Sequence, residues 1–237
     1  MKFKIVVFLV SLTAFFSCKK DTITVSRFSD LATFTQIELN SSFDVYLKED
    51  TSYSIKIVGN EEVIANITLK IEENVLKIGN KTRRKWLSPK SNKVELYINS
   101  KQLKEISANE TCNIKTSGPI TSDAFGLILR SKLNEANIEL DGHQFYYWND
   151  FPCGGKLTLS GKTDELSILN VAIMTVDAQN LIVNNASIDN RSRGDCLITV
   201  LNKLEYSITG AGNIHLYGSP HEIVKLQETS SGRLIQH

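Results

Sequence analysis

Residues Leu127 to Gly142, which read LILRSKLNEANIELDG, give the clearest indication of how this chain folds. This stretch holds two short strand patterns, Leu127-Ile-Leu129 and Ile138-Glu-Leu140, on either side of a polar segment. Apolar residues that alternate with polar ones at a period of two are typical of half-buried β-strands. Two such short strands cannot bury their apolar face alone, so the stretch predicts a unit that stacks on copies of itself.

The same pattern recurs through the second half of the chain. Three further copies carry an apolar residue, a second apolar residue and a glycine at equal or nearly equal offsets: Leu103, Ile114 and Gly118; Tyr146, Leu157 and Gly161; Leu204, Ile214 and Gly218. With weaker copies between them, the starts lie about 16 to 24 residues apart, which is the period of a solenoid coil. The stacked positions that we expect to point inward are Leu127, Ile138, Leu157, Ile198, Ile208 and Ile214.

The first half of the chain is also rich in strand patterns, from Phe34-Thr-Gln-Ile-Glu-Leu39 to Val94-Glu-Leu-Tyr-Ile98. The segment Asn60–Asn66 is the one helical pattern, since it begins with a good N-cap followed by acidic residues. The expected fold class is therefore all-β: a right-handed, β-helix-like solenoid of short strands, with an N-terminal β-rich half that contains one short helix. We expect this domain to cover residues 34–236, in two halves of about 34–100 and 101–236.

The N-terminus has the features of a secretory signal peptide, expected to cover residues 1–17. Lys2 and Lys4 precede a short apolar run, which is too short to span a membrane as a helix, since spanning needs about 20 residues. Cys18 follows the small residue Ser17, as in a bacterial lipobox, although the usual leucine three residues before the cysteine is Phe15. We expect Cys18 to carry lipid that attaches the chain to the outer membrane, with residues 18–33 as a linker; an ordinary leader with an incidental cysteine is the alternative.

Composition excludes several classes of function. The net charge is +1, and loss of the two leader lysines lowers it to −1, which argues against a nucleic-acid-binding protein. The other cysteines are Cys112, Cys153 and Cys196, and no pair of them has the spacing of a zinc ligand set. We expect buried thiols, with Cys112 and Cys196 several coils apart and unable to pair, and we expect no metal and no cofactor.

The closing segment Ser207–Pro220, which contains Thr-Gly-Ala-Gly-Asn-Ile, resembles the family described as putative auto-transporter adhesin, head GIN domain. The early strand Phe43-Asp-Val-Tyr-Leu47 is also similar to that family, and the resemblance covers about Phe34 to Ile235. It departs from the family's glycine-rich turns at Leu169–Val171 and Asn190–Gly194. The resemblance implies an exported bacterial protein, often a lipoprotein, with two stacked solenoid-like halves. It implies no established activity.

The segment His143–Phe151 is the first candidate for a binding surface, because it concentrates five aromatic residues. With Tyr146 at a repeat core position, an unbulged strand points Tyr147 outward and Trp148 inward. A bulge would expose both Tyr147 and Trp148, and exposed aromatic residues often contact glycans or proteins. The alternative is that a bulged coil packs its aromatic residues against a neighbouring loop.

The segment Asn80–Lys93 is the second candidate, because it carries six basic residues and no acidic one. Arg83, Arg84 and Trp86 could together contact an acidic polysaccharide or lipid head groups, whereas a long solvated loop is the alternative.

Catalysis has weaker support in the sequence. Glycosidases need paired carboxylates, and here only Asp141 and Asp150 flank His143, at positions more typical of turns. We expect a non-enzymatic, adhesin-like lipoprotein of the cell envelope that binds a glycan or an envelope protein. A structural spacer is the first alternative, and a polysaccharide-active enzyme is the second.

Overall fold

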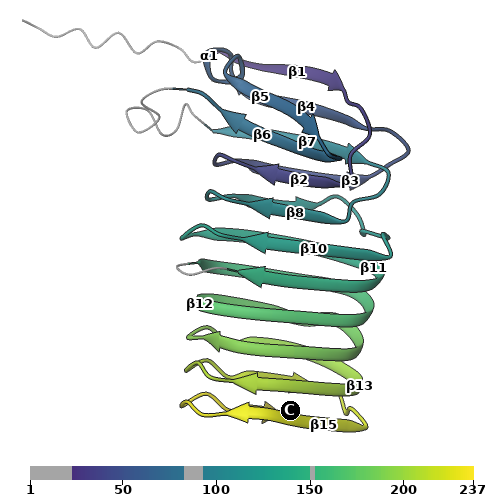
Figure 1. Ribbon diagram of the computed structural model, residues 1–237, viewed down its shortest axis with the longest axis vertical. Helices are drawn as coiled ribbons and strands as arrows, with labels where there is room; N and C mark the ends of the chain where they lie inside the picture. The colour runs from purple at the N-terminus through teal and green to yellow at the C-terminus, as the bar shows by residue number, and fades with distance from the viewer. Residues whose placement is uncertain (1–22, 83–92, 150–152) are drawn as a thin grey trace, which may run out of the picture.

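The computed structural model describes residues 23–82, 93–149 and 153–237. In these residues the chain is almost entirely β-strand and winds into a β-solenoid of about six turns. Figure 1 shows the turns stacked along one axis, from β1 and α1 at one end to β15 at the other. The all-β solenoid that the repeats predicted is therefore confirmed.

The elements of the N-terminal part are β1 (Thr24–Asp30), β2 (Gln36–Leu39), β3 (Asp44–Glu49), β4 (Ser54–Asn60), α1 (Glu61–Ile64), β5 (Ile67–Glu72), β6 (Val75–Asn80) and β7 (Val94–Ser100). Those of the remaining part are β8 (Glu105–Ala108), β9 (Asn113–Thr116), β10 (Ala124–Leu129), β11 (Asn134–Asn149), β12 (Gly154–Ser192), β13 (Cys196–Ile208), β14 (Ile214–Tyr217), β15 (Glu222–Glu228) and β16 (Leu234–Gln236).

The sixteen strands of the described residues belong to one sheet, which folds around the core so that it has two facing layers. One layer contains β7, β3, β9 and the start of β11, and the other contains β6, β2, β8, β10 and the end of β11. Long strands such as β11 and β12 turn the corner between the layers, so one strand contributes to both. Pairing between successive coils is parallel, as expected when each coil follows the same path.

The core lies between the two layers and consists of stacked aliphatic side chains. The six residues that the repeats placed inside, Leu127, Ile138, Leu157, Ile198, Ile208 and Ile214, all have 0% exposure. Their prediction is confirmed. Cys112, Cys153 and Cys196 are also buried, and within the described residues they form no disulfide, as expected.

The N-terminal end of the solenoid is closed by antiparallel strands and the short helix. β1 pairs with β4, β5 pairs with β6, and α1 buries Val63 and Ile64 against the end of the core. The Asn60 side chain accepts a hydrogen bond from the Glu62 backbone N–H at 2.9 Å, which confirms the predicted N-cap. Residues 24–30 fall within the expected linker, but they form β1 because they pair along the exposed edge of β4.

The C-terminal end is open and carries polar residues at positions that face inward. Lys225 pairs with the buried Tyr206, and Gln236 pairs with the buried Leu216. Charged or polar inward positions on the last strands discourage pairing with another sheet edge.

The predicted register of the aromatic segment is wrong by one residue. Leu127 pairs with Tyr147, so the spacing at this coil is 20 residues and Tyr147, not Tyr146, takes the core position. Phe145 and Tyr147 point inward, and Tyr146 and Trp148 point outward. The pairing of β11 with β10 is regular through this segment, so no bulge is needed.

Candidate functional site

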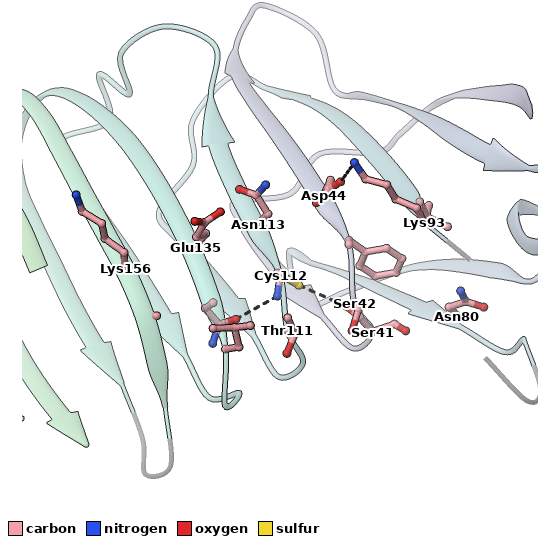
Figure 2. Close-up of a pocket in the computed structure, with 15 residues that line it drawn as sticks. Ser41, Ser42, Asp44, Asn80, Lys93, Thr111, Cys112, Asn113, Glu135 and Lys156 are labelled. Atoms are coloured by element: carbon pink, nitrogen blue, oxygen red, sulfur yellow. Dashed lines mark hydrogen bonds and ion pairs between the residues drawn. The ribbon is translucent and has the colours of Figure 1, made fainter. Parts of the chain in front are cut away.

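A groove with a volume of about 1020 Å³ lies at one corner of the solenoid, where β3, β7, β9, β11 and β12 begin. Figure 2 shows that its lining side chains come from successive coils, with Asp44, Asn113, Glu135 and Lys156 on neighbouring strands. The groove therefore depends on the stacking of coils that are far apart in the sequence.

The same corner is packed more tightly in the later coils. A Cβ added to Gly194 would lie 2.2 Å from the Met174 carbonyl oxygen, and one added to Gly212 would lie 2.1 Å from the Gly194 carbonyl oxygen. These turns can stack closely only because they lack side chains. The earlier turns carry Ser42, Thr111 and Leu133 at this corner instead, and the groove opens there.

The apolar part of the groove is formed by Phe43, Val94 and Leu133. The Phe43 and Val94 side chains are buried in the floor, whereas Leu133 is 63% exposed. The Cys112 thiol below them donates to the Ser41 carbonyl oxygen at 3.4 Å, and burial raises its pKa to about 12. This thiol is a packing group, because only the thiolate form is reactive.

The charged side chains of the groove are mostly paired. Lys93 Nζ lies 2.7 Å from Asp44 Oδ2, and this contact raises the pKa of Lys93. Lys156 Nζ lies 2.8 Å from Asp177 Oδ2 on the next coil. The exposed Glu135 carboxylate has neither a hydrogen-bond nor an ion-pair partner in the structure described here, so it is free to accept hydrogen bonds from a ligand.

The two aromatic residues that the sequence proposed for binding point to opposite faces of their strand. Tyr147 is 1% exposed, so it cannot contact a ligand while its coil is folded; the expectation that it faces outward is wrong. Trp148 is 37% exposed on the outer surface, and the Arg130 guanidinium lies 5.4 Å from its ring centroid. Contact between Trp148 and a ligand stays a prediction.

The basic segment proposed for binding lies only partly within the described residues. Arg83, Arg84 and Trp86 lie outside the described residues, as do Cys18 and Asp150. Asn80 and Lys93, at the two ends of that segment, both line the groove.

The opposite corner of the solenoid carries the polar residues that were considered as candidates for catalysis. His143 Nδ1 lies 2.9 Å from Asp164 Oδ2, and this hydrogen bond raises the pKa of His143. Asp141 is held by Lys162 at 3.1 Å. All four side chains are exposed to solvent, which is typical of turn residues. Within the described ranges, no group of three histidine, cysteine, aspartate or glutamate residues is arranged to bind a metal ion.

Sequence reasoning missed the groove, including Phe43, Leu133 and Glu135. A signal was present, because the turns at residues 41–43, 111–112 and 131–133 contain no glycine, unlike the later turns at residues 194, 210 and 212. This difference in glycine content between the turns becomes apparent only after the coils have been aligned with one another.

The fold is similar to those of several crystal structures. A protein from Bacteroides fragilis described as a putative adhesin has a TM-score of 0.82 at 17% identity, and the match covers 91% of this chain and 97% of that chain. A putative adhesin from Parabacteroides distasonis has a TM-score of 0.61 at 15% identity, covering 92% and 98% of the two chains. A putative lipid binding protein from the same species has a TM-score of 0.60 at 17% identity, covering 90% and 96%. At these identities the similarity establishes the fold alone.

Two further comparisons bear on identity. No curated protein matches the chain. A family model matches residues 33–220, which confirms the resemblance seen in the closing segment and the early strand. The chain therefore belongs to the family described as putative auto-transporter adhesin, head GIN domain.

Proposed function

We propose that this protein is a non-enzymatic lipoprotein of the bacterial cell envelope that recognises a glycan or an envelope protein through the corner groove. Membership of an adhesin-like family supports an extracellular or envelope location and a binding role. The leader sequence and Cys18 support attachment to the outer membrane through lipid, because acyl chains on one cysteine can supply the several anchors that stable attachment needs. In the described part of the chain, no helix is long and apolar enough to cross a membrane.

The groove is the observation that carries the proposal. Sites for small ligands are concave, mostly apolar and supplied with a few polar groups that fix orientation, and their volumes are about 300 to 1,000 Å³. The corner groove has this character, with Phe43, Val94 and Leu133 beside the unpaired Glu135 carboxylate. The His143 corner offers a smaller and more polar hollow of about 450 Å³, in which His143 pairs with Asp164 and Lys162 pairs with Asp141.

The name of one structural neighbour adds a ligand class to be tested. The Parabacteroides distasonis protein described as a putative lipid binding protein shares the fold at 17% identity. An amphiphile therefore belongs among the test ligands, although an identity this low transfers no ligand.

The proposal is tested by filling the groove without disturbing the coils. Thr111→Trp places a large side chain at an exposed lining position, and Asn137→Trp places the same side chain at an exposed position on β11 outside the lining. Both full-length variants should retain the circular dichroism spectrum of the parent. Binding to immobilised glycans, amphiphiles and envelope proteins should be lost in Thr111→Trp and kept in Asn137→Trp.

Equal binding by the two variants would place the recognition surface elsewhere. If the parent binds none of these ligands, a structural spacer becomes the better account.

A further inference from the structure

We infer that the corner groove binds an uncharged saccharide, an inference that rests on the proposed function and narrows its ligand class. Three independent features of the lining favour this class over anionic polysaccharides, lipid phosphates and protein partners. They are the charge that remains after ion pairing, the kinds of hydrogen-bonding groups, and the shape of the apolar part.

The charge of the lining disfavours an anionic ligand. Lys93 is engaged by Asp44 at 2.7 Å and Lys156 by Asp177 at 2.8 Å, so neither lysine of the described lining is free to meet an anion. The remaining charged group is the unpaired Glu135 carboxylate. An approaching carboxylate, sulfate or phosphate would meet the negative charge of Glu135, and the two lysines of the described lining are already held by other carboxylates, which disfavours binding and slows encounter.

The hydrogen-bonding groups match a polyhydroxylated ligand. Ser42 and Thr111 contribute hydroxyl groups, and Asn80 and Asn113 contribute side-chain amides. Such groups both donate and accept, as do the hydroxyls of a sugar. The exposed Glu135 carboxylate is acceptor-only, so it can accept from hydroxyl donors, whereas the Asn113 side-chain oxygen is buried and has no hydrogen-bond partner within the described residues. This combination suits neighbouring sugar hydroxyls better than an acyl chain.

The apolar part is small and local. Leu133 stands at the rim and Phe43 and Val94 form the floor, an area suited to the C–H face of a sugar ring. A stable protein partner would need about 800 Å² on each side and a cluster of exposed aromatic anchors. The other exposed large apolar side chains of the described chain, such as Leu201 and Leu226, are not among the residues that line the groove.

Two aromatic residues on the outer surface of the early coils, Tyr46 and Tyr97, are a less suitable site for a sugar. Tyr46 and Tyr97 stack on each other with centroids 4.7 Å apart and planes at 10°. Lys56 Nζ lies 5.8 Å from the Tyr97 centroid. Because the facing ring surfaces are already in contact with each other, the pair is built for rigidity between strands rather than for stacking on sugars.

The test uses two sets of probes and matched variants of the full-length chain in detergent. The uncharged probes are oligosaccharides of glucose, mannose, galactose and N-acetylglucosamine; the anionic probes are polygalacturonate and heparin. Glu135→Ala and Leu133→Ser alter the groove, whereas Glu139→Ala removes an exposed carboxylate from the same strand outside the lining. Affinities are measured by isothermal titration calorimetry at low salt and at about 0.5 M salt, where charge attraction is screened.

At least one uncharged oligosaccharide should bind with an affinity that salt does not change. Loss of a hydrogen bond to a charged group should weaken that binding about tenfold or more in Glu135→Ala. Leu133→Ser should also weaken it, and Glu139→Ala should bind like the parent. Binding of an anionic probe through the groove, or of a protein that Glu135→Ala releases, would overturn the saccharide inference but leave the proposed function standing. Binding of an uncharged probe that none of the groove variants changes would overturn both.

Discussion

The ring of Tyr146 lies flat over Gly126 on the neighbouring coil. A Cβ at Gly126 would fall 1.9 Å from the ring carbon Cζ, and the Tyr146 hydroxyl donates to Glu105 Oε2 at 2.6 Å. The three residues belong to β11, β10 and β8, so one side chain spans three successive coils from the outside. This contact accounts for the register of the aromatic segment, because it requires Tyr146 to face outward.

Gly126→Ala should therefore destabilise the protein by forcing the ring away from the sheet. Overpacking of this kind costs about 1 to 3 kcal/mol in the free energy of unfolding. Tyr146→Phe keeps the ring and should cost only about 1 kcal/mol for the lost hydrogen bond. Urea denaturation measures both changes. In a Tyr146→Ala background, Gly126→Ala should cost little; an equal cost in both backgrounds would show that the ring contact is not the cause.

Tyr147 is the opposite case, because its hydroxyl is buried without a hydrogen-bond partner in the described structure. Removing an unsatisfied buried polar group can be neutral or stabilising, so Tyr147→Phe should not lower the free energy of unfolding. Leu127→Ala, at the paired core position, should lower it by about 2 to 5 kcal/mol. A loss of more than about 1 kcal/mol in Tyr147→Phe would mean that the hydroxyl has a partner, such as a buried water.

The three cysteines of the domain should be unreactive in the folded protein. Burial raises the pKa of Cys112 and of Cys196 to about 12, so almost no thiolate is present near neutral pH, and Cys153 is also buried. With Cys18 replaced by serine, N-ethylmaleimide should label no thiol in the native chain and three in the denatured chain. Mass spectrometry counts the labels. Rapid labelling of native Cys112 would show that the groove floor opens to solvent.

The proposed lipid anchor depends on Cys18. Cys18→Ser should abolish incorporation of a labelled fatty acid and release the protein from the membrane fraction, because several buried acyl chains are lost together. Cys112→Ser serves as the control, since Cys112 lies in the core and should not be acylated. Labelling that persists in Cys18→Ser would refute the lipoprotein assignment.

The repeats were sufficient to predict the solenoid and six of its core positions, because coil stacking imposes a period on the sequence. The prediction failed at Tyr146, since counting fixed offsets cannot detect a coil that is one residue longer. The groove could not be predicted, because Phe43, Leu133 and Glu135 come together only through the pairing of strands that are far apart in the chain. Composition also could not show that Glu135 is left unpaired. Glu135 is unpaired because Lys156 pairs with Asp177 on the next coil instead.

Hydrogen exchange of the full-length chain, measured by mass spectrometry with and without its bound ligand, tests most directly the claim that the corner groove is the recognition site. A ligand in the groove should slow exchange at the starts of β9 and β11, in peptides that contain Thr111–Asn113 and Leu133–Glu135. Peptides from the His143 corner and from the C-terminal strands β15 and β16 should exchange at unchanged rates. Protection at Trp148 and Arg130 or at the His143 corner, with none at Thr111–Asn113, would contradict the account.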